Sequence, residues 1–290
     1  MSTTARTLGV IGGSGLYELE SLTDIEEIEM TTSFGAPSDA IIAGTLGDVR
    51  MLFLPRHGRD HRIPPHRINY RANVLALKMA GAEQILSVSA VGSMRENIHP
   101  GDMVVVDQFI DRTRNRIDTF FDDDGVVAHV GFSDPIDEHL AHALSGAARA
   151  AGASVHTGGV YLCREGPQFS TLGESRLYRS WGVSVIGMTN LPEARLAREA
   201  ELPYATLAMV TDYDCWHEGH DAVSVEAVVA MMHDNVAKAK QIIAELAANV
   251  PDPSGRPASS ALSGAIITRP DSISEDARKK LRPLIGKYVP

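Results

Sequence analysis

Short apolar runs alternate along this chain with segments of helical periodicity, and this alternation constrains the fold more than any other feature. The runs are four to eight residues long, rich in Val, Ile or Leu, and flanked by Gly or Pro, as buried strands are. We expect strands at residues 8–11, 50–54, 84–89, 103–107, 183–187 and 204–211, and helices at residues 70–80, 191–200, 224–247 and 275–287. Strands that alternate with helices predict one α/β domain, with a central sheet covered by helices.

One boundary is visible near the end of the chain. Residues 251–264 read PDPSGRPASSALSG, in which nine of fourteen residues are Pro, Ser or Gly. This composition predicts a flexible linker between a domain at residues 1–250 and a C-terminal tail at residues 265–290. Residues 272–275 (SISE) resemble a capping box and predict that the tail forms a short helix. Such a tail docks on its own or a neighbouring subunit, or is disordered.

Charge and cysteine content limit the classes of partner. The chain has 27 Lys and Arg against 37 Asp and Glu, a net charge of −10, whereas sequence-independent nucleic-acid binding needs a basic surface. The two cysteines, Cys163 and Cys215, are too few for a disulfide framework and indicate a reducing compartment. The sequence contains no run of 18 apolar residues and no signal-peptide core. We therefore expect a cytoplasmic protein that binds neither nucleic acid nor membrane.

Three motifs near the ends of expected strands have residues that suit an anion. Glycine N–H groups and the Ser14 hydroxyl could approach a phosphate, and the Arg56 guanidinium matches one in shape, with His57 beside it. Small residues at 87–93 (SVSAVGS) would allow a ligand close to the carboxyl edge of the sheet. Each motif also has an ordinary interpretation, as a tight turn, solvated loop charges or close packing. His57 and His61 are four residues apart without a third ligand at metal-binding spacing, so we expect no metal.

Two further motifs suit a planar base. Residues 165–170 (EGPQFS) form a Gly-Pro turn that carries Phe169 and Ser170, although a surface turn would look the same. Asp212 and Asp214 end the last apolar run, and extended geometry would point both carboxylates the same way. Paired carboxylates in a partly apolar site disfavour double ionisation, so one can stay protonated and donate to a leaving nitrogen. An Asx turn or a helix cap is the structural alternative.

In this order, the motifs resemble the family of trimeric purine nucleoside phosphorylases and methylthioadenosine phosphorylases. The resemblance runs from residue 12 to about residue 246 and is carried by GGSGLYEL, FGAPSD, PRHGRDH, INYRAN, SAVGSMRE, PGDMVVVDQFIDRT, EGPQFS, WGVSVIGMTNLPEA and VTDYDCW. It implies a central mixed, twisted sheet flanked by helices. It also implies a pentosyltransferase of purine and methionine salvage, which cleaves the N-glycosidic bond of methylthioadenosine with inorganic phosphate. The products would be adenine and 5-methylthioribose 1-phosphate, made by a homotrimer without a further cofactor.

The resemblance also implies roles for individual residues. It implies phosphate binding by Ser14, Arg56, His57, Ser89, Ala90 and Thr189, and catalysis at the adenine by Asp212 and Asp214. It implies contacts with base and ribose by Phe169, Ser170 and Met188, with the methylthio group by Val225, Val228 and Val229, and with a neighbouring subunit's site by His129. This chain departs from the family at Ser14 and Ser89, where Thr is common, and at Gln168, where the animal members have Arg.

Three other functions stay open at this point. Within the family, the alternative is a phosphorylase for 6-oxopurine nucleosides or methylthioinosine, in which Asn commonly stands at the position of Asp212. Outside it, a dinucleotide-dependent oxidoreductase would need a third glycine in the first motif, but Glu18 stands there. A nucleoside-binding module without catalysis would show saturable binding and no phosphate-dependent turnover.

Overall fold

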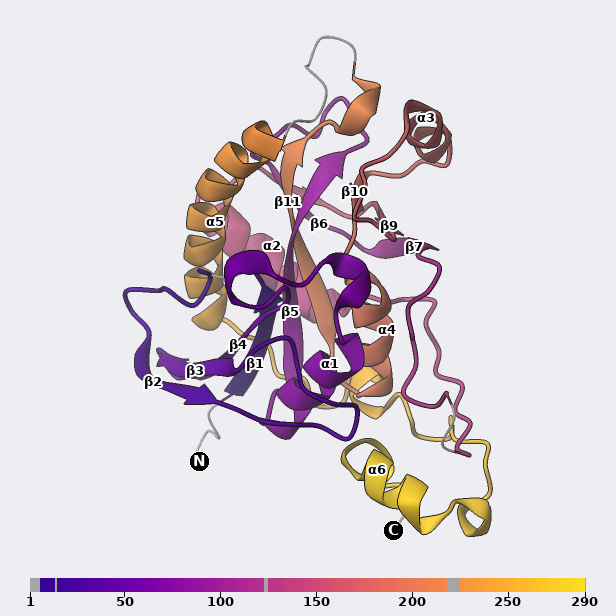
Figure 1. The fold of residues 1–290 in the computed structure, drawn as a ribbon. Coiled ribbons are helices and arrows are strands. Elements are labelled where there is room, and N and C mark those ends of the chain that lie inside the picture. Colours follow the sequence, from indigo (N-terminus) through magenta and orange to yellow (C-terminus); the bar gives the residue numbers. More distant parts are fainter. Residues whose placement is uncertain (1–5, 14, 123–124, 218–224, 290) are drawn as a thin grey trace.

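The computed structural model describes residues 6–13, 15–122, 125–217 and 225–289, the last range without the side chains of residues 225–230. In this part of the chain, eleven strands form one sheet (Figure 1). The strands are β1 (Arg6–Gly12), β2 (Thr23–Ile28), β3 (Ile41–Leu46), β4 (Val49–Pro55), β5 (Gln84–Ser93), β6 (Met103–Val105), β7 (Gln108–Arg112), β8 (Val155–Thr157), β9 (Val160–Arg164), β10 (Val185–Gly187) and β11 (Tyr204–Asp212).

The sheet is mixed, as the resemblance implies. Its main path runs β2-β3-β4-β1-β5-β10-β9-β7, and a branch leads from β5 through β11 and β6 to β8. Strands β4, β1, β5 and β11 run parallel to their neighbours in this group, so that their carboxyl ends meet at one edge. Antiparallel pairings join β2 to β3, β3 to β4, β10 to β5 and β11 to β6.

Helices cover both sides of this sheet (Figure 1). They are α1 (Tyr70–Met79), α2 (Glu138–Ala150), α3 (Leu172–Ser180), α4 (Asn190–Glu199), α5 (Val225–Ala247) and α6 (Glu275–Ile285). Helices α2 and α5 pack together on one side, and α1 packs against α4 on the other. None of the described helices combines the length and the apolar composition needed to cross a membrane.

The predicted strands and helices are all present, with ends that shift by up to four residues. The analysis of apolar runs missed β2, β3, β7, β8, β9, α2 and α3. Strand β2 is almost entirely exposed and β8 has three residues, so neither carries an apolar run. Both missed helices do have capping signals in the sequence: Asp137 accepts from Leu140 N before α2, and Thr171 forms a capping box with Glu174 at α3.

Residues 251–264 differ from the flexible linker that their composition predicts. Arg256 is 6% exposed and forms an ion pair with Asp137, the residue that caps α2. Ala258 and Leu262 are buried, and Leu262 N donates to Glu201 Oε1 at 3.0 Å. The prediction of a flexible linker rested on the low apolar content that Pro and Ser give to this segment. These residues do not prevent a short turn from packing, and here the 3₁₀ helix Pro257–Ser260 does so.

The C-terminal tail forms a helix and packs on its own chain. Leu281, Leu284 and Ile285 of α6 are buried, and α6 contacts α1. Beyond the helix, Lys287 Nζ and Tyr288 Oη each lie 2.6 Å from the Glu201 carboxylate. The apolar face of α6 therefore docks near the start of β11, away from the carboxyl ends of the parallel strands (Figure 1).

Glu199, the last residue of α4, holds the loop that follows β7. Its carboxylate accepts hydrogen bonds from Thr119 Oγ1 and from Phe120 N, each at 2.7 Å. Burial is the main cause that raises the pKa of Glu199 to about 7 from its ordinary value of 4.5. The folded protein therefore binds more protons than the unfolded chain between these values, and this part of the stability is lost as the pH rises through 7.

We expect Glu199→Gln to remove this pH dependence, because an amide can accept from Phe120 N and donate to Thr119 Oγ1 without carrying a charge. The free energy of unfolding of the variant should match the wild type near pH 4 and exceed it by about 3 kcal/mol at pH 8. Urea titrations across this range measure the difference. The same substitution at the exposed Glu96 is the control. If the free energies of unfolding of the wild type and of Glu199→Gln change with pH in parallel, the raised pKa of Glu199 is contradicted.

Candidate active site

The sheet opens along β5, and this opening organises the site. Strand β1 pairs with β5 as far as Ser87, whereas β10 joins the same side of β5 at Gly92. No described strand pairs with residues 88–91 on this side, so Ser89 and Ala90 border a gap in the sheet. Ligands of α/β sheets bind at the carboxyl ends of strands where neighbouring connections diverge. The small-residue run predicted to approach a ligand lies at such a place.

Arg56 follows β4 and is buried in this gap rather than solvated at the surface. Its Nε and Nη2 atoms bind both oxygens of Glu193 at 2.8 and 3.0 Å, and the two side chains are 2% and 1% exposed. Nη2 also donates to Ser87 Oγ at 2.7 Å, and Nη1 donates to Val88 O at 3.0 Å. These bonds use most of the five donors, and one Nη1 hydrogen is left for a ligand.

A chain of buried hydrogen bonds connects this ion pair to Ser89. Ser89 Oγ donates to Asn190 Oδ1 at 3.0 Å, and Asn190 Nδ2 donates to Tyr204 Oη at 3.0 Å. Tyr204 Oη in turn donates to Glu193 Oε1 at 2.9 Å. Removal of Glu193 would therefore leave Arg56 as an unpaired buried charge and release Ser89 as well, since buried networks are stable only when every member has a partner.

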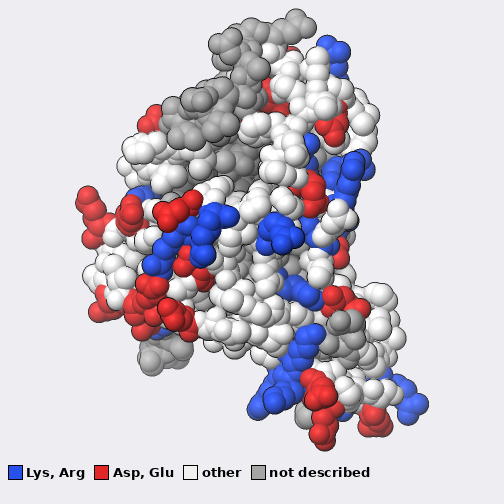
Figure 2. Space-filling model, viewed as in Figure 1, with Lys and Arg blue, Asp and Glu red and all other residues white. Residues whose placement is uncertain are grey.

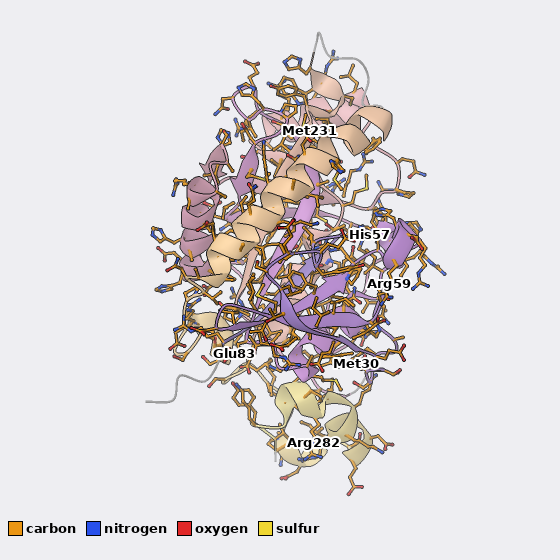
Figure 3. All side chains as sticks on the ribbon, turned by 90° about the vertical axis from the view of Figure 1, so that its left-hand side faces the viewer. Met30, His57, Arg59, Glu83, Met231 and Arg282 are labelled. Carbon is orange, nitrogen blue, oxygen red and sulfur yellow. The ribbon has the colours of Figure 1, made fainter. Side chains whose placement is uncertain are left out.

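His57 lies next to Arg56, in the loop that Figure 3 labels at His57 and Arg59. His57 Nδ1 is 2.8 Å from Ile63 O and so carries the proton of the neutral ring, which leaves Nε2 as an acceptor. Burial, followed by the charge of Arg56, lowers the pKa of His57 to about 4. The His61 ring stacks on it at 4.1 Å, so the two rings lie face to face. Among the described residues, no group of three metal-binding side chains converges.

Thr189 precedes α4 at the far side of the gap. Its hydroxyl is buried and has no hydrogen-bond partner among the described residues. An unpaired buried hydroxyl beside a buried guanidinium suits an anion that arrives with the ligand. Of the six residues predicted to bind phosphate, Arg56, His57, Ser89, Ala90 and Thr189 border this region, and Ser14 lies outside the described residues.

Asp212 and Asp214 stand at the carboxyl end of β11, beside Gly92 of β5. The strand geometry does not continue through them: Asp214 has φ 53° and begins a 3₁₀ turn. Its N–H donates to Asp212 Oδ1 at 2.7 Å, which is an Asx turn, while Thr211 Oγ1 donates to Asp212 Oδ2 at 2.7 Å. The Asx-turn alternative is therefore present, but it coexists with two half-buried carboxyl groups.

Burial shifts the pKa of both carboxyl groups in the same direction. It raises the pKa of Asp212, although the two hydrogen bonds oppose the shift. Burial also raises the pKa of Asp214, and the nearby Asp212 charge adds to this effect. A side chain at position 92 would bring its Cβ within 2.8 Å of Asp212 Oδ1, so Gly92 leaves room for the carboxyl group. Either carboxyl group can therefore keep a proton to a higher pH than an exposed one.

The loop at residues 165–170 approaches this turn. Cys215 Sγ donates to Ser170 O at 3.4 Å, and Arg164 Nη1 donates to Ser170 Oγ at 3.0 Å. Met188 lies over Gly166, where a Cβ would be 2.5 Å from the Met188 sulfur. Phe169 is 48% exposed, so its ring is available to a ligand or another subunit. Ser170 and Met188 thus lie on the loops next to the gap, and their contacts with base and ribose stay a prediction.

Two further predicted groups are not placed at this site by the described residues. The side chains of Val225, Val228 and Val229 lie outside the described residues, so their role stays a prediction. His129 belongs to a loop tied to the tail, because its N–H donates to Ala265 O at 2.9 Å. It lines a separate cavity of about 280 Å³ with Phe132, Arg195 and Glu199.

Sequence reasoning missed Glu193 and Arg116. Arg116 is 2% exposed, and its guanidinium donates to Met188 O, Leu191 O and Glu165 O at 2.6–2.8 Å, which holds both loops of the base side together. Glu193 could have been found from the sequence, because it is an acidic residue within NLPEARLA, a segment otherwise predicted to pack on the sheet. A buried acid needs a partner. Nothing in the sequence around Arg116 distinguishes its role from that of the neighbouring Arg112 and Arg114.

Comparisons with known proteins agree with this geometry. Residues 7–248 match the family model described as the phosphorylase superfamily. The chain is 55% identical over 285 residues to the S-methyl-5'-thioadenosine phosphorylase of Geobacter sulfurreducens, covering 98% of this chain and 99% of that relative. It is 54% identical over 286 residues to the protein of the same name from Thermosynechococcus vestitus, covering 97% and 99%.

Solved structures extend the similarity to three dimensions. A methylthioadenosine phosphorylase sourced from an antarctic soil metagenomic library has a TM-score of 0.91 and 43% identity, covering 97% of this chain and 99% of that one. The methylthioadenosine phosphorylase of Schistosoma mansoni in complex with adenine has a TM-score of 0.83 and 35% identity, covering 90% and 98%. Sequence, fold and the arrangement of the site agree, and the chain belongs to the phosphorylase superfamily.

Proposed function

We propose that this protein cleaves the N-glycosidic bond of methylthioadenosine with inorganic phosphate, releasing adenine and 5-methylthioribose 1-phosphate. The observation that carries the proposal is the half-buried Asp212 and Asp214 pair at the carboxyl end of β11, whose pKa values burial raises. It lies beside a gap with a buried guanidinium and a hydroxyl that has no partner among the described residues. Relatives named S-methyl-5'-thioadenosine phosphorylase that are similar over their whole length support the choice of substrate.

The proposed reaction divides the site into two sides. Phosphate lies in the β5 gap, near Arg56, His57 and Thr189, and attacks C1′ of the ribose as the C1′–N9 bond breaks. The electrons of that bond move into the purine, so the leaving group needs a proton or a hydrogen bond at N7. Asp212 donates there, because burial favours its protonated form. Inorganic phosphate is the second substrate, and the chemistry calls for no metal or redox cofactor.

The carboxyl pair also distinguishes adenine from 6-oxopurines. Asp214 accepts from the exocyclic amine of adenine, whereas an oxygen at position 6 would meet a carboxylate as a second acceptor. Phe169 and Met188 contact the base and ribose from the loops that Arg116 holds. Val225, Val228 and Val229 surround the methylthio group, which has no hydrogen bond to offer.

We expect Asp212→Asn to lower turnover of methylthioadenosine by about 10²–10³, because an amide can donate a hydrogen bond to N7 but cannot transfer a proton to it. Relative activity should shift towards methylthioinosine, because an amide can donate to O6. Adenine or hypoxanthine release is measured with and without phosphate for methylthioadenosine, adenosine, methylthioinosine and inosine.

The matched control for this substitution is Asp137→Asn. Asp137 is a buried carboxylate paired with Arg256, and its backbone N–H donates to Tyr204 O at the opposite end of β11. It should lower stability without changing the ratio of the two methylthio substrates. Turnover without phosphate in the wild type would overturn the proposed function, and an unchanged substrate ratio in Asp212→Asn would overturn the role of Asp212.

A homotrimer is the assembly we propose for this protein. Two separate sets of exposed apolar side chains support it, one around α3 with Leu172, Leu177 and Trp181, the other with Val127 and Ile267. Two different patches on one chain make a head-to-tail contact, which closes into a ring. The second patch adjoins His129 through the Ala128–Ile266 bridge, so the contact would bring His129 to a neighbour's nucleoside.

We expect Ile267→Asp to dissociate the trimer, because it places a charge in an apolar contact. Ile25→Asp is the control, since Ile25 and Ile267 are similarly exposed, at 61% and 63%, and Ile25 lies on β2. Light scattering coupled to gel filtration gives the mass of each. The KM for methylthioadenosine should rise with dissociation. A wild-type monomer with full activity would contradict the proposed assembly.

The two cysteines are free thiols, Cys163 buried and Cys215 half-buried, which is consistent with a reducing environment. We infer that the protein works in the cytoplasm, where the adenine and methylthioribose phosphate it releases enter purine and methionine salvage.

A further inference from the structure

Tyr161 carries a buried hydroxyl that nothing in the fold uses. It lies in β9 and is 0% exposed, and its Oη has no hydrogen-bond partner among the described residues. A buried polar group without a partner is costly, and native proteins contain few of them. A phenylalanine would pack the same volume without this cost, so the retained hydroxyl indicates a partner that arrives from outside the chain.

Space for this hydroxyl is made by Gly187, at the end of the neighbouring strand β10. A Cβ at position 187 would lie 1.9 Å from Tyr161 Oη and 2.5 Å from Cζ. Gly187 is not among the glycines with positive φ, so its backbone conformation alone does not call for glycine. The ring is held on another side by Phe109, edge to face at 5.7 Å. The absence of a side chain at position 187 therefore leaves space for the Tyr161 hydroxyl.

The hydroxyl is directed towards the predicted phosphate residues. Burial raises the pKa of Tyr161 to about 12, while the Ser89 hydroxyl and both the hydroxyl and the backbone of Thr189, which lie close to its Oη, oppose the shift. Tyr161 therefore keeps its proton at neutral pH and can donate it in a hydrogen bond. Thr189 Oγ1 is buried and without a partner in the described residues too. The hydroxyls of Tyr161, Thr189 and Ser89 thus lie close together at the gap in β5.

Other donors at this gap are already occupied. Ser89 Oγ donates to Asn190, and His57 Nδ1 donates to Ile63 O. Arg56 uses most of its hydrogens on Glu193 and on neighbouring oxygens. A dianionic ligand needs several donors, and the hydroxyls of Tyr161 and Thr189 can supply them together with the remaining Nη1 hydrogen of Arg56.

We propose that Tyr161 is a further phosphate-binding residue, whose hydroxyl donates a hydrogen bond to the anion held at Ser89 and Thr189. The inference rests on the proposed function in that the anion is the phosphate co-substrate. It assigns Gly187 a role as well, as the position that must stay without a side chain for Tyr161 to reach the ligand.

Tyr161→Phe tests the inference, because it removes one oxygen and keeps the ring. The Kd for inorganic phosphate, measured by calorimetry without nucleoside, should rise about tenfold or more, as expected for a lost hydrogen bond to a charged ligand. The phosphate concentration for half-maximal turnover should rise by a similar factor. The KM for methylthioadenosine at saturating phosphate should change by less than about twofold, since the hydroxyl faces the anion.

Ser145→Ala is the matched control. Ser145 lies in α2, and its hydroxyl is likewise buried and without a partner among the described residues. It should leave the phosphate Kd unchanged. Thr189→Val provides a second measurement, and its effect on the phosphate Kd should not simply add to that of Tyr161→Phe if one anion binds both hydroxyls.

The outcomes separate the inference from the proposed function. An unchanged phosphate Kd in folded Tyr161→Phe, or an equal weakening of phosphate and nucleoside binding, overturns the role of Tyr161. Wild-type protein that binds phosphate but does not cleave methylthioadenosine overturns the proposed function alone, and a weaker phosphate Kd in Tyr161→Phe would still support the inference.

Discussion

The buried ion pair between Arg56 and Glu193 is the interaction on which the arrangement of the site depends. It joins the end of β4 to the first turn of α4, across 137 residues of sequence. The same guanidinium is 2% exposed and donates to carbonyl oxygens of β1 and β5. The ends of three parallel strands and one helix therefore meet on a single side chain, because a buried charge is stable only when its donors are used.

Burial acts in opposite directions on the acids and bases around this pair. It lowers the pKa of His57 and raises the pKa of Asp212 and Asp214, so each group shifts towards its uncharged form. Many of the acidic side chains that give the chain its net charge of −10 lie at the surface (Figure 2), and two of them on β2, Glu26 and Glu27, pair with Arg50 and Arg59. An anion entering the gap thus meets a buried Arg56–Glu193 pair and neutral donors, rather than the field of exposed carboxylates.

Apolar periodicity predicted several elements of the core but missed others. Residues 204–211 are buried throughout and were recognisable as β11, whereas the exposed β2, the half-buried β7 and the buried but short β3 were not recognised. The segment 251–264 was misjudged because composition does not show that Arg256 would find Asp137. Most predicted phosphate and base residues do border the gap in β5, since the motifs that contain them follow strands whose ends meet.

The sequence by itself determined the α/β class and the order of the motifs, because strand and helix periodicities are local properties of the chain. It also indicated the Asp212 and Asp214 pair. Only the tertiary structure decided that Arg56 is paired and buried, that Asp212 and Asp214 form an Asx turn, and that Tyr161 reaches the gap past Gly187. The physical reason is that burial and hydrogen-bond partners arise between segments distant in sequence, and a side chain's charge, pKa and free donors follow from those partners.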